Sequence, residues 1–200
     1  MKLGVYGGTF DPVHSGHLAV AEEVQRQLGL DEVLFVPAGQ PWMKAAGPLA
    51  PARHRLEMVR RAVAGRAGLS VSAMEVERPG PSYTLQTLEE LGRQRPGDEL
   101  YLILSWESLA EFPRWYRPEG IIRLCRLVVV PRPGAIRPDL AALDRAVPGL
   151  AERTLLLEGP LVDISATEVR RRLREGQPVE GLLPPAVRDY IQKKGLYGVG

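Results

Sequence analysis

The chain has 200 residues, of which 44% are hydrophobic and 25% are charged, a composition that is typical of a folded globular domain and excludes intrinsic disorder. The net charge of +2 is too small to indicate a nucleic-acid partner, no apolar run reaches the roughly eighteen residues of a membrane span, and the N-terminal residues contain no signal-peptide core. A single cysteine, Cys125, excludes an internal disulfide and favours the cytoplasm.

Strand and helix patterns alternate along the chain. Strands are expected at 3–6, 33–36, 69–72, 100–104, 127–130 and 154–157. Helices are expected at 18–28, 52–64, 83–92, 118–124, 140–146, 167–174 and 186–194. Gly195 is expected to end the last of these helices. The strands are continuous apolar runs, such as LYLIL and RLVVV, which is typical of strands covered on both faces by helices.

This alternation predicts an α/β fold, a single doubly wound, Rossmann-like domain with a mostly parallel sheet flanked by helices. The domain is expected to span residues 1–200, with the C-terminal helical part, about 163–200, packed on it. In such sheets ligands bind at the carboxyl ends of the strands, and the motifs described next all follow strand ends.

Residues 3–17, LGVYGGTFDPVHSGH, form the most informative motif. An apolar strand runs into paired glycines, and His14 and His17 then come at the start of a helix. Backbone N–H groups and imidazoles at a helix N-terminus favour a nucleotide phosphate. Two alternatives stay open, a transition-metal site formed by Asp11, His14 and His17, and a glycine-rich turn with solvent-facing histidines.

Residues 37–51, PAGQPWMKAAGPLAP, predict a long loop, and long loops in compact domains are usually functional or mobile. Lys44 in this loop and Arg132 in VPRPG are cations that follow strand ends, where they either meet phosphate or are simply solvated. Arg55, just after the loop, is expected either at the site or exposed on a helix.

Two serines are expected to begin helices. Ser82 is placed to cap the helix expected at 83–92. Ser165 and Glu168 have the spacing of a capping box. Of the arginines at 170–172, two are expected to form a solvated basic face.

These motifs resemble the nucleotidyltransferase superfamily, whose mark is [TH]-x-G-H and reads HSGH in this chain. GGTFDPVHSGH, PAGQPWMK, SYT, FPRWY and ISATEVR are similar in particular to the nicotinate-mononucleotide adenylyltransferases. The resemblance covers nearly the whole chain. It implies adenylyl transfer from ATP to nicotinate mononucleotide, giving deamido-NAD and pyrophosphate.

The resemblance also implies roles for individual residues. The implied ATP site comprises Gly8, Thr9, Phe10, His14, His17, Ile164, Ser165, Thr167 and Arg170. The implied pyridine-mononucleotide site comprises Lys44, Tyr83, Thr84, Trp115, Tyr116 and Arg132. Trp115 is expected to stack on the pyridine ring, and the N–H groups near Tyr83 and Thr84 to hold its carboxylate. The groups expected to act in catalysis are His14, His17, Lys44 and Arg170, with Mg²⁺ held mainly by the ATP phosphates.

The chain departs from the family pattern after the fourth strand, where G-x-D is replaced by Ser105, Trp106 and Glu107. These three larger side chains are expected to reshape the nucleotide pocket, altering nucleotide choice or lowering activity. Ala166 also replaces a serine of the family pattern.

The expected partners are therefore ATP and nicotinate mononucleotide, with no nucleic acid and no membrane, and a homo-oligomer stays open. One alternative is another small-molecule adenylyl- or cytidylyltransferase, such as one acting on phosphopantetheine. Another is a nucleotide-binding regulatory protein with reduced catalysis, which the changed segment at 105–107 would favour.

Overall fold

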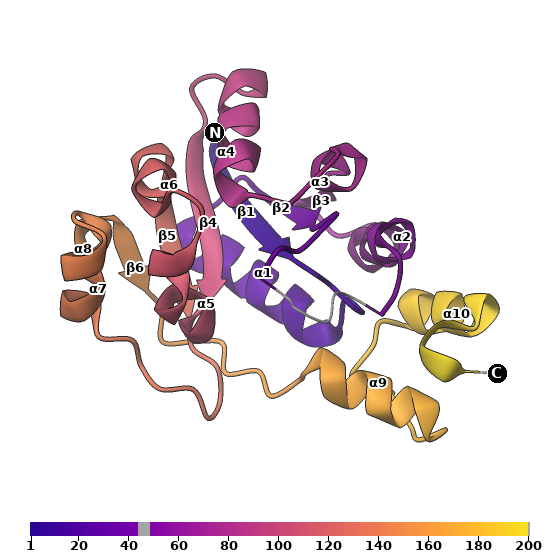
Figure 1. The fold of residues 1–200 in the computed structure, drawn as a ribbon. Coiled ribbons are helices and arrows are strands. Elements are labelled where there is room, and N and C mark those ends of the chain that lie inside the picture. The colour runs from indigo at the N-terminus through magenta and orange to yellow at the C-terminus, as the bar shows by residue number, and fades with distance from the viewer. Residues whose placement is uncertain (44–48, 200) are drawn as a thin grey trace.

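A six-stranded parallel sheet forms the centre of the computed structural model, which describes residues 1–43 and 49–199 (Figure 1). The strands are β1 (Lys2–Gly8), β2 (Glu32–Pro37), β3 (Leu69–Val71), β4 (Glu99–Ser105), β5 (Cys125–Val130) and β6 (Thr154–Leu156). The longer helices are α1 (Ser15–Leu28), α2 (Ala52–Val63), α4 (Thr84–Gln94), α6 (Pro118–Leu124), α7 (Leu140–Ala146), α9 (Ala166–Arg174) and α10 (Pro185–Lys194). Each of these strands and helices was predicted from the sequence.

The structure also contains short helices that the periodicity did not predict. They are α3 (Met74–Glu77), α5 (Trp106–Ala110), α8 (Leu150–Arg153) and the 3₁₀ turns η1 (Phe112–Arg114) and η2 (Leu196–Gly198). A helix of one turn repeats no apolar spacing, so an amphipathic pattern cannot reveal it.

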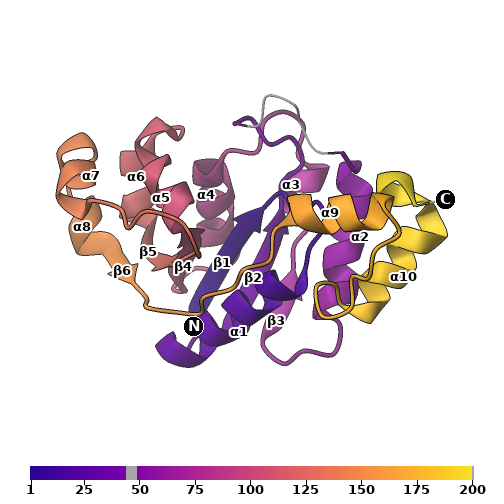
Figure 2. The same ribbon diagram turned by 90° about the horizontal axis from the view of Figure 1, so that it is seen from below.

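Helices cover both faces of the sheet, as the apolar strand sequences predict (Figure 2). Along β4, Tyr101 and Ile103 face the core under α1, α2, α9 and α10, whereas Leu102 and Leu104 face the core under α4 to α8. This alternation has the period of two of an extended strand. In the part of the chain that the structure describes, no helix is long and apolar enough to cross a membrane.

The strand order is β3-β2-β1-β4-β5-β6, with every neighbouring pair parallel. The chain moves outward from β1 through β2 to β3 and then returns to β4 on the other side of β1. The loops that leave β1 and β4 therefore diverge to opposite faces. In doubly wound sheets this divergence opens a crevice at the carboxyl ends of the two strands.

The C-terminal segment crosses the carboxyl end of the sheet. After β6 the chain runs beneath the strand ends in Figure 1 and reaches α9 and α10, which lie on the same side of the molecule as α2 (Figures 1 and 2). Val169 of α9 and Ile191 of α10 are fully buried in the same core as Met58 of α2. Gly195 ends α10 in the left-handed conformation, with φ of 58°, as its position predicts.

Candidate active site

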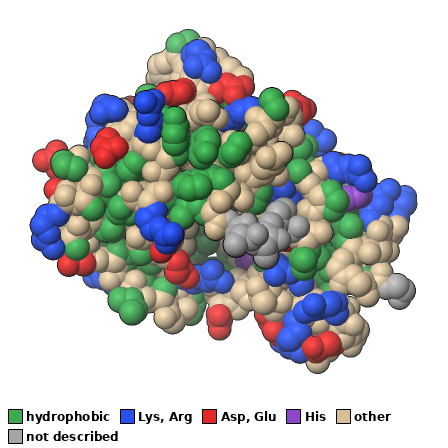
Figure 3. All heavy atoms as spheres, viewed as in Figure 1, with side chains coloured by type: hydrophobic (Ala, Val, Ile, Leu, Met, Phe, Trp, Pro, Cys, Tyr) green, Lys and Arg blue, Asp and Glu red, His purple; other side chains and the backbone are tan. Residues whose placement is uncertain are grey.

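A cavity of about 520 Å³ lies in the crevice between β1 and β4, a size within the usual range for small-molecule sites. Its lining includes eleven of the residues expected at the site, namely Gly8, Thr9, Phe10, His14, His17, Thr84, Ser105, Glu107, Trp115, Arg132 and Ile164. These residues come from segments far apart in the sequence. In Figure 3 hydrophobic side chains occupy much of the centre of the face seen in Figure 1, with charged side chains scattered around them.

The two N-terminal histidines form a compact pair at the start of α1. The N–H of His14 donates to Nδ1 of His17 over 3.1 Å, and the two rings stack with centroids 3.7 Å apart. Because Nδ1 of His17 accepts this bond, the neutral ring carries its proton on Nε2. His17 therefore has an N–H donor on the side of the ring away from the backbone, and this residue lines the cavity.

The imidazole of His14 is buried, with 6% of the residue exposed. Burial, and then the nearby guanidinium of Arg132, lower the pKa of His14 to about 4. Nδ1 of His14 has no hydrogen-bond partner among the described residues. The ring is therefore neutral at physiological pH, and a bound anion would favour its protonation by offsetting the charge of Arg132.

Two glycines are required by close packing around this pair. A Cβ on Gly16 would lie 2.8 Å from Cγ1 of Val162 in the segment that crosses the sheet, and a Cβ on Gly8 would lie 2.9 Å from the ring of Phe10. A Cβ atom essentially never makes a non-bonded contact this short, so either side chain or backbone would have to shift. The glycines of HSGH and GGTF therefore let the crossing segment and Phe10 close around the cavity.

Arg170 of α9 reaches the loop that carries the histidines. Its Nη1 donates to the carbonyl oxygen of Asp11 over 2.7 Å and its Nη2 donates to Oγ1 of Thr167 over 3.3 Å. Residues 159 positions apart are thus in direct contact. Ser165, Thr167 and Arg170 lie beside the cavity and are not part of its lining, to which this segment contributes Ile164.

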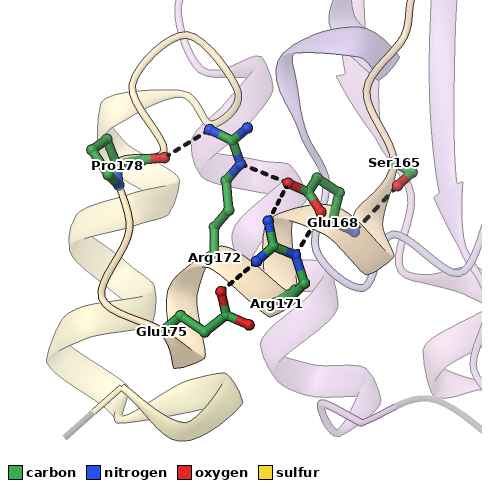
Figure 4. Close-up of polar contacts among 6 residues, drawn as sticks. All are labelled: Ser165, Glu168, Arg171, Arg172, Glu175 and Pro178. Atoms are coloured by element: carbon green, nitrogen blue, oxygen red, sulfur yellow. Dashed lines mark hydrogen bonds and ion pairs between the residues drawn. The ribbon is translucent and has the colours of Figure 1, made fainter.

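The predicted capping box at α9 is half formed (Figure 4). Oγ of Ser165 accepts from the N–H of Glu168 over 3.2 Å, as expected. The carboxylate of Glu168 turns instead to Arg171 and Arg172, whose side chains it accepts from at 2.8 Å. These two arginines form the surface face that was predicted for two of the three, and Arg170 is the one directed to the site.

The carboxylate of Asp11 is fully engaged within the protein, which argues against the metal-site alternative. It accepts from the backbone N–H groups of Leu49 and Ala50 and from the hydroxyl of Tyr197. No cluster of three His, Cys, Asp or Glu side chains able to hold a metal occurs in the ranges 1–43 and 49–199.

The prediction that Ser82 caps α4 is wrong. The cap position is Tyr83, and Oγ of Ser82 instead accepts from the N–H groups of Gly39 (2.9 Å) and Gln40 (3.2 Å) after β2. The hydroxyl satisfies the loop rather than the helix, so the N–H groups at the start of α4 have no side-chain cap. Such uncapped groups favour a bound anion.

The aromatic residues near α4 divide into two sets. Trp115 lines the cavity and packs on Phe112, with ring centroids 5.3 Å apart. Tyr83 and Tyr116 stack on each other, with ring centroids 4.5 Å apart, and do not line the cavity. Trp115 is therefore the aromatic side chain of the FPRWY segment that can face a bound ring.

The changed segment at 105–107 also divides. Ser105 and Glu107 line the cavity, and Glu107 lies 3.7 Å from Nη1 of Arg132. Trp106 does not line the cavity, contrary to expectation, because its indole packs against the core under α4 to α8. Oγ of Ser105 accepts from the N–H of Ser108 and so caps α5.

Two further expectations concern the 37–51 loop. Lys44 falls outside the described residues. Arg55 is neither at the cavity nor exposed, because it is fully buried and donates to the carbonyl oxygens of Thr9 (2.7 Å), Gly39 (3.1 Å) and Ala50 (3.1 Å). A single guanidinium thus joins the segments that follow β1 and β2, which sequence patterns gave no means of detecting.

Glu75 is a cavity residue that the sequence did not indicate. Its carboxylate is buried and accepts from Oγ1 of Thr87 over 2.5 Å, and Thr87 in turn accepts from Arg78 over 2.9 Å. Burial raises the pKa of Glu75 above its ordinary value of 4.5, against the effect of the Thr87 hydrogen bond. This carboxyl group lies on α3, the short helix that was not predicted.

Glu75→Gln is expected to change the pH dependence of stability. Since the folded-state pKa is raised, the native protein binds this proton more tightly than the unfolded chain, and the wild type gains stability relative to the variant as the pH falls through the raised pKa. Urea unfolding at about pH 7.5 and about pH 5.0 measures the difference. A wild-type-to-variant difference that is the same at both pH values would contradict it, and Glu77→Gln, at an exposed glutamate of the same helix, serves as the control.

Comparison with known proteins connects this geometry to a family. Residues 5–172 match the family model described as cytidylyltransferase-like. A protein of Dehalococcoides mccartyi named "Probable nicotinate-nucleotide adenylyltransferase" is 49% identical over 198 residues, covering 98% of this chain and 97% of that protein. A protein of the same name from Roseiflexus sp. is 49% identical over 195 residues, with the same two coverages.

The fold comparison agrees. The structure described as "Plasmodium falciparum nicotinic acid mononucleotide adenylyltransferase complexed with NaAD" superposes with a TM-score of 0.79 at 19% identity, covering 100% of this chain and 98% of that one. At this identity the likeness establishes the fold, with the same arrangement of sheet and helices.

Proposed function

The chain belongs to the nicotinate-nucleotide adenylyltransferases, nucleotidyltransferases of NAD biosynthesis, and we propose that it joins ATP and nicotinate mononucleotide in the cavity between β1 and β4. The observation that supports this assignment most is the contact of Arg170 with Asp11, in the loop that leads to HSGH, across 159 positions of sequence. The products are deamido-NAD and pyrophosphate.

The reaction forms a bond between a phosphate oxygen of the mononucleotide and the α-phosphorus of ATP, and breaks the bond from that phosphorus to the pyrophosphate oxygen. The nucleophile is already an anion, so no general base is required. The barrier lies in placing two polyanions in line and stabilising the charge that develops on the leaving group.

The side chains of the cavity suit this task. His17 supplies an Nε2–H donor, and His14, whose lowered pKa keeps it neutral at physiological pH, gains positive character beside an anion. Arg170 stands beside the same loop, and Arg132 adds a guanidinium to the lining. We assign the binding of the ATP phosphates to His14, His17, Arg170 and the start of α9. Lys44 lies outside the described residues, and we assign it to the same phosphates.

The opposite part of the cavity suits the pyridine mononucleotide. Trp115 offers an indole face for stacking on a flat heterocycle. The uncapped N–H groups at the start of α4, next to Thr84, favour a carboxylate over a carboxamide. We therefore expect nicotinate mononucleotide to be preferred to its amide.

Magnesium fits this arrangement through the substrates. The described residues hold no cluster of carboxylates or imidazoles that would form a protein-built metal site, and Mg²⁺ is commonly bound by substrate phosphates together with water. When bound there it neutralises charge on the phosphate oxygens. The cytoplasm is the compartment that we expect from the single cysteine.

Pyrophosphate release from ATP tests the proposal directly. Release is expected with nicotinate mononucleotide, more slowly with its amide, and not with phosphopantetheine. Rapid release with phosphopantetheine alone would favour the alternative transferase. ATP binding by calorimetry without release on any acceptor would favour a regulatory protein.

The residues at 105 and 107 are expected to influence nucleotide choice. Because Ser105 and Glu107 line the cavity and Glu107 pairs with Arg132, the double variant Ser105→Gly, Glu107→Asp should change the ratio of kcat/KM for ATP to that for CTP and GTP. Because the ion pair is half exposed, the change should be about two- to fivefold. Identical substrate profiles before and after substitution would end this idea, and Glu111→Asp, an exposed glutamate beyond α5, serves as the control.

A further inference from the structure

The C-terminal turn is tied to the loop that carries the histidines. Tyr197, in the 3₁₀ turn η2 after α10, donates its hydroxyl to Oδ1 of Asp11 over 2.7 Å, across 186 positions of sequence. Asp11 lies three residues before His14 and is 6% exposed. This contact therefore connects the end of the chain to the first loop of the proposed site.

The backbone of Tyr197 adopts an unfavourable conformation to make this contact. Its φ of 62° and ψ of 21° lie in the left-handed region, which is sterically unfavourable for a residue with a Cβ. The neighbours Gly195 and Gly198, with φ of 58° and 82°, reverse the chain direction without such a cost. A strained residue persists when its surroundings hold it in place, and the surroundings here are the hydrogen bond to Asp11 and the core against which Tyr197 packs.

Asp11 connects several segments at once. Its carboxylate accepts from the N–H of Leu49 over 2.8 Å and from that of Ala50 over 3.1 Å, besides the hydroxyl of Tyr197. Its carbonyl oxygen accepts from Arg170. A buried carboxylate is stable only when its oxygens are hydrogen-bonded in this way.

The hydroxyl of Tyr197 stays protonated and so always donates. Burial, and then the hydrogen bond to Asp11, raise the pKa of Tyr197 far above its ordinary value. The fully buried Arg55, which donates to the carbonyl oxygen of Ala50, provides a positive charge near the same carboxylate. Removal of the tyrosine hydroxyl would leave Oδ1 of Asp11 with the single donor from Ala50.

We propose that Tyr197 is a positioning residue, whose hydroxyl holds Asp11 and thereby fixes the HSGH loop, the backbone at Leu49–Ala50 and Arg170 relative to one another. It acts through Asp11 and lies outside the cavity lining. The kinetic part of this inference rests on the proposed adenylyl transfer, whereas the structural part does not.

Tyr197→Phe tests the inference, with Tyr190→Phe as the matched control. Each substitution removes one hydroxyl from a tyrosine near the C-terminus. The hydroxyl of Tyr190, however, is hydrogen-bonded to Nδ1 of His54 at 2.8 Å and not to Asp11. Amide hydrogen exchange at Leu49 and Ala50 is measured first. Exchange is expected to be roughly tenfold faster in Tyr197→Phe, corresponding to the loss of about one hydrogen bond, and unchanged in Tyr190→Phe.

Kinetics supply the second measurement. Misplaced phosphate donors reduce the stabilisation of the transition state more than they reduce substrate binding. We therefore expect kcat for pyrophosphate release to fall about tenfold in Tyr197→Phe, while KM for ATP changes less than about threefold. Tyr190→Phe should keep kcat near the wild-type value.

Unchanged exchange at Leu49 and Ala50, or an equal loss of kcat in the two variants, would overturn the inference. Faster exchange in Tyr197→Phe, together with a wild-type protein that releases no pyrophosphate, would remove the proposed function and leave the structural link standing.

Discussion

Replacement of His17 by Ala is expected to lower kcat for pyrophosphate release by about 10²–10³, the usual effect of removing one preorganised donor from a site of developing charge. The reason is the Nε2–H donor, which the hydrogen bond from the backbone of His14 to Nδ1 of His17 holds in place. KM for ATP should rise much less, because most phosphate contacts remain. Steady-state kinetics with both substrates varied give the two constants separately.

Two further variants separate this effect from a loss of structure. His17→Asn keeps an acceptor for the N–H of His14 but lacks the distal donor, so it should have the stability of the wild type and the low kcat of the alanine variant. His54→Ala removes a histidine whose ring contacts Tyr190 instead, and should retain full turnover. Near-normal turnover in both His17 variants would remove this residue from the mechanism.

Replacement of Arg55 by Leu is expected to be the most destabilising substitution. It would leave one buried and two partly buried carbonyl oxygens without their donor and the carboxylate of Asp11 without its nearby positive charge. Removing one member of a buried charged group typically costs about 3–5 kcal/mol. For a chain of this size the melting temperature should fall by roughly 10 °C.

Arg60, an exposed residue on the same helix, provides the control for this experiment. Arg60→Leu should shift the melting temperature by about 1–2 °C at most, as surface substitutions usually do. Calorimetric scans of the two variants beside the wild type make the comparison. Equal shifts for Arg55→Leu and Arg60→Leu would mean that the buried guanidinium does not hold the loops together.

The sheet was the part of the fold most accessible from the sequence. Strands such as LYLIL and RLVVV are buried on both faces of the sheet. Their burial therefore appears in the sequence as a run of consecutive apolar residues. The short helices α3 and α5 lack any such repeat. Their formation depends on the packing of α3 against β2 and of α5 against β4, and on the Ser105 cap, which are visible only in the folded chain.

The candidate site was predictable where one segment contains the whole signal. The HSGH loop is of this kind, since glycines, histidines and a helix start adjoin one another in the sequence. Arg55, Glu75 and Tyr197 are of the other kind, because each depends on a partner that the topology brings from elsewhere. Trp106 was predicted to face the pocket because it lies between two cavity residues in the sequence, but its side chain packs against the core.

The departure at 105–107 gains a physical interpretation from the structure. The sequence predicted that all three side chains would alter the pocket, but only Ser105 and Glu107 face it. Glu107 places a carboxylate beside Arg132, so the guanidinium meets an incoming phosphate with part of its charge already balanced. Nucleotide choice, if it has changed, is therefore expected to depend on this pair rather than on the indole.

We propose that one cavity holds both substrates end to end between the HSGH loop and Trp115. A crystal structure of the protein soaked with deamido-NAD tests it most directly. We predict the product's bridging phosphates beside His14 and His17, and its pyridine ring on Trp115 near the start of α4. Product bound away from the β1–β4 crevice, or within it but with no phosphate contact to either histidine, would contradict the account.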